Sequence, residues 1–273
     1  YVVDLRLKSL MSTNVRAILI CLVAYFCFDL MAVHVRFLSE RYNPQELSLY
    51  RNVLGIIPAL MFLAYNGQLT FRLREYRIAK WRLAVGRGLL IAVAQFLLYS
   101  SLMRLELATV SALGQTVATF VVLIAIVLYS EHVGIWRWGA VIFGLLGAVI
   151  IIQPGSDLFT LHALFPVGAA LCYAASTVTL RSFDNSVSNA ILFMYSAISA
   201  AFGALILAIG TTDFSPIYSY KDFLIILSMS FFGGFGVVFL MYAFRNAPSS
   251  VLAPFSYFGI LNAFVLGWVF FGE

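Results

Sequence analysis

The sequence predicts an all-α integral membrane protein, on the basis of its composition and the lengths of its apolar runs. Of 273 residues, 62% are hydrophobic and 11% are charged, and the mean hydropathy is +0.96. A soluble globular domain carries about 25% charged residues, so this composition excludes that class. Most of the apolar runs are long enough to cross about 30 Å of hydrocarbon as a helix.

We expect nine membrane-spanning helices after a polar cytoplasmic lead-in of residues 1–15. The connections are short except for residues 66–83, where FRLREYRIAKWR is a candidate interfacial amphipathic helix. The expected spans are 16–38, 46–65, 84–103, 107–129, 136–152, 164–182, 189–209, 222–244 and 250–271.

Basic residues in the connections predict the orientation, because short cytoplasmic loops carry an excess of Lys and Arg. With the N-terminus inside, eleven such residues lie on the inner side and four on the outer side. We therefore expect a cytoplasmic N-terminus in a bacterial-type inner membrane. The same topology accounts for the net charge of +5, so nucleic acid is not expected as a partner.

The spans repeat as a unit of five. A shift of 142 residues places Glu131 on Glu273 and each of the first four spans on one of the last four. A unit with an odd number of spans enters the membrane from the opposite side in its second copy, which is an inverted-topology repeat. The expected units are residues 16–152 and 164–273. The counterpart of span 136–152 would follow Glu273, so we expect a ten-helix 5+5 fold and an incomplete chain.

Three stretches resemble the drug/metabolite transporter superfamily, EamA type. That family's first repeat ends much like SEHVGIWRWGAVIFGLLGAVIIIQPG, and its second repeat much like YAFRNAPSSVLAPFSYFGILNAFVLGWVFFGE, including Pro254 and Glu273. Its first two helices are similar to RAILICLVAYFCFDLMAVHVRFLSERYNPQELSLYRNVLG, with Arg51 at the usual helix-two arginine. One departure is Gln115-Thr116, near where first repeats often carry a proline.

The resemblance implies ten helices, both termini in the cytoplasm, and a carrier that moves a small organic metabolite by alternating access. The segments RWGAVIFGLLG and APFSYF look closest to carriers of S-adenosylmethionine and similar metabolites. Relatives move amino acids, riboflavin, purines or drugs. The expected substrate is therefore like S-adenosylmethionine, an amino acid or a nucleobase, and export of drugs or other small molecules by the same fold is the alternative.

Other classes of function have less support from the residues. No span holds paired carboxylates, no metalloprotease motif or nucleophile elbow is present, and no filter-like segment appears. We therefore expect no enzyme activity, catalytic residue, metal ligand or cofactor, and a channel is the weaker option. The expected partners are the small-molecule substrate, membrane lipid and, as a candidate coupling ion, the proton, while the oligomeric state stays open.

Two charged residues within spans are candidate substrate ligands, because ionisable groups there are costly and usually face a cavity or one another. Asp29 is the only acidic residue well inside a span. It is interpreted as the counter-charge of a cationic substrate group, a proton-coupling carboxylate, or a structural group bonded to a neighbouring helix. Arg51 is a candidate to bind a substrate carboxylate, with a structural role between helices as the alternative.

Polar and aromatic side chains at mid-span complete the candidate set, because amides and amphipathic aromatics suit a planar or zwitterionic ligand. They are Gln115, Tyr173, Ser176, Tyr195, Tyr257 and Asn262.

Four residues are assigned gating or structural roles. Glu131 and Glu273 end equivalent spans, where a carboxylate opposes the helix dipole, so each is expected to be compensated by a nearby basic loop residue or by the N-terminus of the following helix. Pro254 is expected to bend its helix. Gly234 belongs to a glycine cluster that permits close helix packing and is a candidate hinge.

Overall fold

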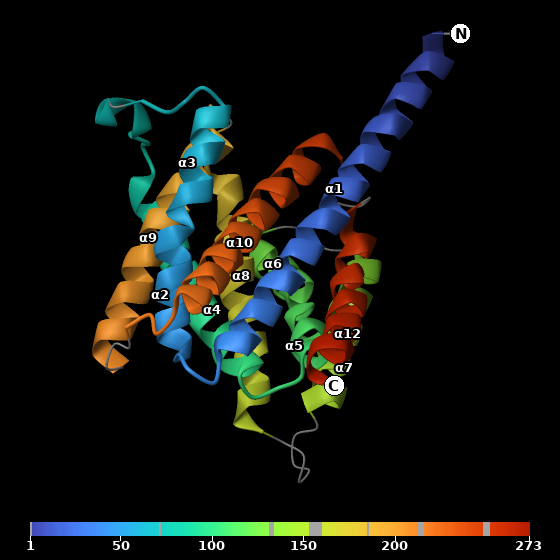
Figure 1. Cartoon of the computed structure of the whole chain (residues 1–273). Helices are drawn as coiled ribbons and strands as arrows, with labels where there is room; N and C mark the ends of the chain where they lie inside the picture. Colours follow the sequence, from blue (N-terminus) through green and yellow to red (C-terminus); the bar gives the residue numbers. More distant parts are fainter. Residues whose placement is uncertain are drawn as a thin grey trace.

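The computed structural model is built from helices, with no strand among the residues it describes, which are 2–70, 72–130, 134–152, 160–184, 186–211, 216–247 and 252–273 (Figure 1). The α-helices are α1 (Val2–Leu38), α2 (Pro44–Leu54), α3 (Ile56–Tyr65), α4 (Trp81–Leu102), α5 (Leu107–Gly114), α6 (Thr116–Tyr129), α7 (Ile135–Ile152), α8 (Leu164–Val178), α9 (Asn189–Thr211), α10 (Tyr220–Asn246) and α12 (Phe258–Phe271). The short 3-10 helices are η1 (Leu73–Tyr76), η2 (Leu161–Ala163), η3 (Thr179–Ser182) and η4 (Ala253–Tyr257).

Seven helical segments of the described chain are long and apolar enough to cross a membrane. They are Asn14–Leu38, Pro44–Tyr65, Trp81–Leu102, Leu107–Tyr129, Leu161–Val178, Asn189–Ile209 and Tyr220–Phe244. Two shorter apolar helices, Val141–Ile152 and Phe255–Phe271, lie within the two other expected spans. The prediction of an all-α integral membrane protein is confirmed.

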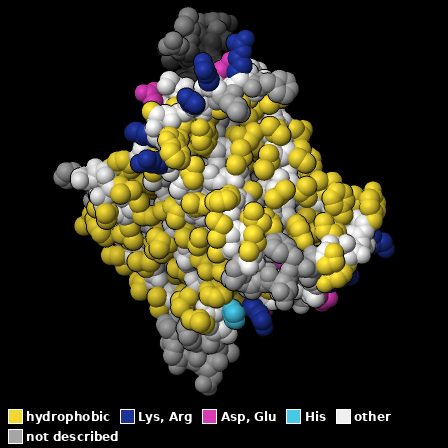
Figure 2. Space-filling view, turned by 90° about the vertical axis from the view of Figure 1, so that its left-hand side faces the viewer, with side chains coloured by type: hydrophobic (Ala, Val, Ile, Leu, Met, Phe, Trp, Pro, Cys, Tyr) yellow, Lys and Arg dark blue, Asp and Glu magenta, His cyan; other side chains and the backbone are white. Residues whose placement is uncertain are grey.

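The surface of the helical bundle is strongly hydrophobic. In Figure 2, hydrophobic side chains cover the middle of the face shown, and Lys and Arg lie toward its edges. Phe143, Ile150 and Trp268 are each more than two-thirds exposed in the isolated chain. Contiguous apolar surface of this extent is not stable in water, so it faces the hydrocarbon of the bilayer.

The second expected span is interrupted at Gly55, between α2 and α3. Pro58 has no N–H to donate to the carbonyl oxygen of Leu54, and its ring crowds the preceding turn. Gly55 fits the interruption because a Cβ there would lie 2.8 Å from the carbonyl oxygen of Arg51.

The fourth expected span is also interrupted, between α5 and α6, although no proline is present. Gln115 N donates to Ala112 O at 3.2 Å, and Ala118 N donates to Gln115 O at 3.1 Å. These bonds to the third preceding residue tighten the helix into a 3-10 turn. Thr116 Oγ1 also donates a hydrogen bond to the carbonyl oxygen of Leu113 at 2.7 Å. The helix is therefore interrupted near the position where first repeats of the family often carry a proline.

Two expectations, for residues 1–15 and for residues 66–83, differ from the structure. The polar lead-in is continuous with α1, which begins at Val2. The candidate interfacial helix of residues 66–83 was wrong, because only the single turn η1 forms before α4. The hydroxyl group of Tyr76 accepts a hydrogen bond from Thr70 N at 2.8 Å and lies 2.9 Å from Thr70 O. These contacts fold the connection into a compact loop.

Helix neighbours recur after five spans. α1 packs on α10, and α4 packs on α8; likewise α1 packs on α12, and α6 on α8. α4 contacts α9, and α10 contacts α2, while α5 contacts α12 and α2 contacts α9. Advancing by five spans converts each pair in this list into another or into itself. An inverted repeat would give this pairing, and the repeat itself stays a prediction.

Candidate functional site

Asp29 lies midway along the membrane-spanning part of α1, and its carboxylate faces α12. Asn262 Nδ2 donates a hydrogen bond to Asp29 Oδ2 at 3.2 Å. A Cβ built on Gly259, one turn earlier on α12, would lie 3.7 Å from Asp29 Oδ2 and 3.8 Å from Ser111 Oγ on α5. The structure therefore brings two of the predicted site residues together and adds Ser111 and Gly259. We call these four residues the Asp29 site.

The Asp29 site has an unbalanced acidic group. Asp29 is partly buried, and no ion pair to it occurs within the described part of the chain. Its one recorded hydrogen-bond donor, the amide of Asn262, carries no net charge. A carboxylate at this depth in a membrane is costly unless it is paired. The arrangement can accept a cation, and the missing Cβ at Gly259 leaves room beside the carboxylate.

Irregular backbone from two helices lies next to this site. Gln115, at the interruption between α5 and α6, donates from Nε2 to Ser256 O at 3.2 Å. Ser256 belongs to η4, the 3-10 helix before α12, and its side chain hydrogen-bonds Tyr25 of α1. Backbone groups freed within a membrane need such partners, which are found where the chain is packed in protein or lines a cavity. Gln115 is thus near the site through Ser256.

Arg51 lies on another side of α1. Its Nη1 donates to Asn52 Oδ1 at 3.0 Å, and its Nε is buried without a hydrogen-bond partner in the described structure. A Cβ on Gly233 of α10 would lie 2.7 Å from both Arg51 Nη2 and Met31 Sδ. Residues two apart on a helix do not share a face, so Met31 and Arg51 are on a different side of α1 from Asp29. The two predicted charged ligands are not brought together.

Of the remaining candidates, Tyr173 lies partly buried on α8 and interacts electrostatically with Arg51, so the structure brings these two predicted residues together. The carbonyl oxygen of Ser176 accepts a hydrogen bond from Nε of the buried Arg87 at 2.7 Å. Tyr195 donates to Tyr76 O at 2.9 Å, and Tyr257 is 62% exposed at the end of η4. None of these tyrosines has a recorded contact with the Asp29 site.

Glu273 is held by a cation and by a helix N-terminus, but the cation lies on α1 and not in a loop, and the N-terminus is that of α5 and not of a following helix. Arg36 Nη2 lies 2.8 Å from Glu273 Oε1, and Leu107 N at the start of α5 donates to Oε2 at 2.8 Å. Arg36 also donates from Nη1 to Leu102 O at 2.7 Å. The partners come from α1 and α5, so this network joins three helices at one end of the bundle. Glu131 lies outside the described residues.

The other two structural candidates are found at close contacts or turns. A Cβ on Gly234 of α10 would lie 2.5 Å from Cβ of Pro58, so the glycine permits contact with the start of α3. Pro254 is in the first turn of η4 and precedes α12. Whether either residue acts in gating stays a prediction.

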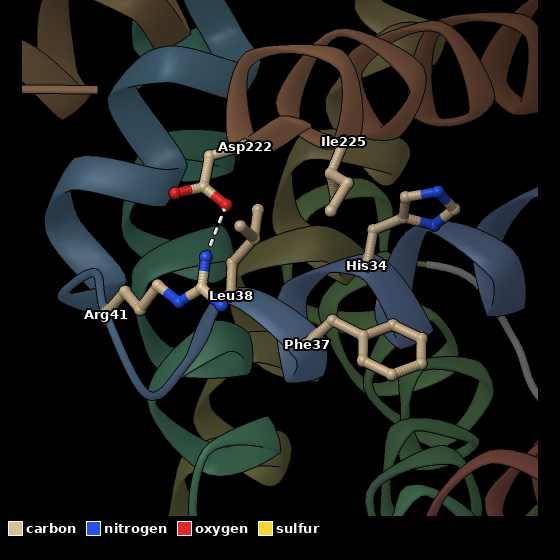
Figure 3. Close-up of a pocket in the computed structure, with 6 residues that line it drawn as sticks. All are labelled: His34, Phe37, Leu38, Arg41, Asp222 and Ile225. Atoms are coloured by element: carbon tan, nitrogen blue, oxygen red, sulfur yellow. Dashed lines mark hydrogen bonds and ion pairs between the residues drawn. The ribbon is translucent and has the colours of Figure 1, made fainter. Parts of the chain in front are cut away.

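A second charged contact, missed by the sequence reasoning, joins Arg41 to Asp222 (Figure 3). Arg41 Nη1 donates to Asp222 Oδ1 at 2.8 Å, and Tyr42 donates to Asp222 Oδ2 at 3.1 Å. Burial raises the pKa of the Tyr42 phenol, which keeps it protonated as a donor. A cavity of about 350 Å³ adjoins the contact and is lined by His34, Phe37, Leu38, Arg41, Asp222 and Ile225. No sequence signal linked Arg41 to a residue so distant in the chain.

An all-helical membrane protein with interrupted spans and polar groups inside the bundle is typical of membrane transporters. The chain belongs to the EamA-like transporter family, whose model matches residues 15–153 and 160–273. This finding confirms the resemblance and the predicted transport of a small metabolite.

Several curated proteins are similar to this chain, two of the three described here over most of their length. The "S-adenosylmethionine uptake transporter" of Rickettsia prowazekii (strain Madrid E) is 24% identical over 93% of this chain and 83% of its own. An "Uncharacterized transporter" of Helicobacter pylori (strain J99) is 23% identical over 91% of this chain and 86% of its own. The "Riboflavin transporter" of Vibrio cholerae is 27% identical over 52% of this chain and 47% of its own.

A solved crystal structure has a similar fold. It superposes with a TM-score of 0.65 over 93% of this chain and 88% of its own, at 18% sequence identity. Identity this low supports the fold alone.

Proposed function

We propose that this chain is a secondary carrier for a small metabolite with a cationic group, and that Asp29 is the counter-charge of that group. The observation that carries the proposal is the partly buried carboxylate at mid-membrane, bonded to Asn262 and without an ion pair in the described structure. S-adenosylmethionine, with its sulfonium and ammonium groups, is the first candidate substrate, and the relatives named for its uptake support that choice. The substrate is moved and not chemically changed.

Alternating access between two inverted units, residues 16–152 and 164–273, is the proposed mechanism. Polar contacts between these units lie at both ends of the bundle: Arg36 with Glu273 at one, and Tyr76 with Tyr195 at the other. Opening either end requires its own contacts to break while those at the other end persist. With the N-terminus in the cytoplasm of a bacterial-type cell, the Arg36–Glu273 end faces outward and the Tyr76–Tyr195 end inward.

Counterflow in proteoliposomes tests the proposal. Vesicles containing the protein are preloaded with S-adenosylmethionine, phenylalanine, adenine, riboflavin or the cationic drug tetraphenylphosphonium, and uptake of trace labelled compound is measured. We expect accumulation with the S-adenosylmethionine preload. Accumulation only with tetraphenylphosphonium would favour the exporter alternative, and accumulation only with neutral compounds would reject Asp29 as a counter-charge. Failure of every preload would reject each of these compounds as the substrate and would favour the channel alternative.

The Asp29→Asn variant tests the residue. We expect counterflow of the cation to fall about tenfold or more, because the buried cation loses a charged partner whose loss typically costs several kcal/mol. Glu40→Gln is the matched control, since Glu40 is an exposed acidic residue in the connection after α1 and its loss should leave counterflow unchanged. A normal rate in Asp29→Asn would remove Asp29 from the substrate site. A variant that keeps exchange but loses net uptake would instead assign Asp29 to proton coupling.

A further inference from the structure

The connection between α3 and α4 carries a concentrated positive charge. Residues 72–82 contain five basic side chains and one acidic side chain, Glu75. The basic residues, all exposed, are Arg72, Arg74, Arg77, Lys80 and Arg82. We call residues 72–82 the basic connection. Within it, Arg72 pairs with Glu75 at 3.9 Å, with the arginine side chain 84% exposed, and Lys80 interacts electrostatically with Asp184. Most of the positive charge, on Arg74, Arg77 and Arg82, has no recorded interaction with an acidic group among the described residues.

The backbone of the basic connection is held against the second half of the molecule. Tyr195 of α9 donates to Tyr76 O at 2.9 Å, and Lys80 Nζ donates to Ser182 O of η3 at 2.5 Å. Ile78 is buried in a small core with Leu192 of α9. The apolar and backbone groups therefore face the protein, while the guanidinium groups face outward. This is a shaped surface and not a loose charged loop.

The basic connection lies at the level where lipid headgroups are expected. It leads directly into the membrane span that begins at Trp81, whose side chain is 51% exposed. Tryptophan at a span terminus typically sits among headgroups. Figure 1 shows the connection projecting at the end of the molecule where α3 ends. Its cations are consequently placed beside the membrane surface.

We propose that the basic connection binds the headgroups of anionic phospholipids. Its cations are spread along an exposed segment and do not converge on a described cavity, which suits several headgroups better than one small anion. Basic clusters next to a membrane span attract anionic lipid in this way. The assignment of the bound lipid to the inner leaflet rests on the proposed function, because it requires a cytoplasmic N-terminus. The proposal that anionic lipid binds does not depend on that orientation. Bound lipid would also stabilise the contacts of Tyr195 and Lys80 that hold this end of the bundle together.

Thermal unfolding of the purified full-length chain in a mild neutral detergent tests the proposal without any transport measurement. Dioleoylphosphatidylglycerol, or dioleoylphosphatidylcholine as the uncharged comparison, is added in increasing amounts, and the midpoint temperature is followed by intrinsic fluorescence. A ligand that binds the folded state raises that temperature with its concentration. We expect the anionic lipid to raise it more than the zwitterionic lipid, and 0.5 M NaCl to reduce the difference, since salt screens exposed charges.

A pair of charge-matched variants locates the site. Arg74→Gln with Arg77→Gln removes two exposed cations from the basic connection, and Arg104→Gln with Lys221→Gln removes two from exposed positions at the other end of the bundle. The first variant should need roughly tenfold more phosphatidylglycerol for the same rise in midpoint temperature, whereas the second should match the parent.

Three results would overturn the proposal. They are an equal effect of both lipids on the parent protein, an equal loss in both double variants, and an equal stabilisation by soluble glycerol phosphate, which would indicate a site for a free anion. Because none of these readouts involves transport, the carrier proposal and the lipid proposal can fail separately.

Discussion

Arg87 shows how a single buried cation can be structural in this bundle. The side chain is 6% exposed, its Nε donates to Ser176 O at 2.7 Å, and its guanidinium carbon lies 5.8 Å from the centre of the Phe183 ring. These contacts tie α4 to α8 and to the residue that follows η3. Asp29, by contrast, has one uncharged partner. The charge of Arg87 is therefore already engaged within the protein, whereas the charge of Asp29 is available to a cationic substrate.

Arg87→Lys should destabilise the protein without abolishing counterflow. Lysine lacks the Nε donor geometry, so the carbonyl oxygen of Ser176 loses one of its two donors and keeps Thr179 Oγ1 at 3.0 Å. A hydrogen bond from a charged group contributes about 1 to 3 kcal/mol. The midpoint of thermal unfolding in detergent measures this loss. Arg82→Lys, at an exposed position, is the control and should not change the midpoint. A variant of unchanged stability that no longer transports would mean that Arg87 acts on the substrate.

At the scale of single helices, close approach and interruption decide the shape of the interior. α10 can pack against the start of α3 because Gly234 has no Cβ to meet Pro58. The interruption at Gln115 similarly lets α5 and α6 leave the straight path of one helix, and it places an amide near η4. Both features set how closely neighbouring helices approach, and neither involves a charged group.

Gly234→Ala should therefore lower stability. Its new methyl group would lie 2.5 Å from Pro58 Cβ, and overpacking of this kind costs typically 1 to 3 kcal/mol. Gly86→Ala is the matched control, because nothing lies within 4 Å of a Cβ there and alanine favours a helix over glycine by about 1 kcal/mol. Thermal unfolding should thus move in opposite directions for the two variants. A fall in both midpoint temperatures would show that the clash with Pro58 is not the cause of the lower stability of Gly234→Ala.

The expected spans could be read from the sequence because the hydrocarbon thickness sets their length. The same physics gave no sign of the interruption at Gln115, which depends on local hydrogen bonds and not on a proline. Asp29 and Asn262 were identifiable as polar groups inside spans, but their contact joins residues 233 positions apart. Ser111 and Gly259 carried no signal of their own, since small residues within spans are ordinary packing residues.

At the scale of the whole molecule, the Arg36–Glu273 contact joins helices at one end of the bundle. The two side chains are 25% and 13% exposed and join α1 to the end of α12, while Leu107 N adds α5. Weakening this contact should favour the state in which this end is open, since a ligand-free equilibrium shifts by the energy difference between the two states.

Arg36→Gln should raise access to the Asp29 site from that end. The site is probed by a cysteine introduced with Ser111→Cys, in a background where Cys21, Cys27 and Cys172 are replaced by alanine. Its labelling by a membrane-impermeant maleimide should become about three- to tenfold faster, as expected from losing about 1 kcal/mol of a partly buried ion pair. Arg104→Gln, which changes an exposed residue outside this contact, should leave the rate unaltered. Equal rates in all three proteins would argue against a gate.

The bond between Leu107 N and Glu273 has a consequence for biosynthesis, because it joins residues 166 positions apart. A ribosome adding about 5 to 20 residues per second needs on the order of 10 s to synthesise that interval. Until Glu273 is synthesised, Leu107 N at the start of α5 lacks its hydrogen-bond acceptor and Arg36 lacks its carboxylate partner. Both Arg36 and Leu107 are by then already part of the nascent chain. This end of the first half is therefore completed only after α12 has been synthesised, and the first half must persist as an unfinished bundle in the meantime.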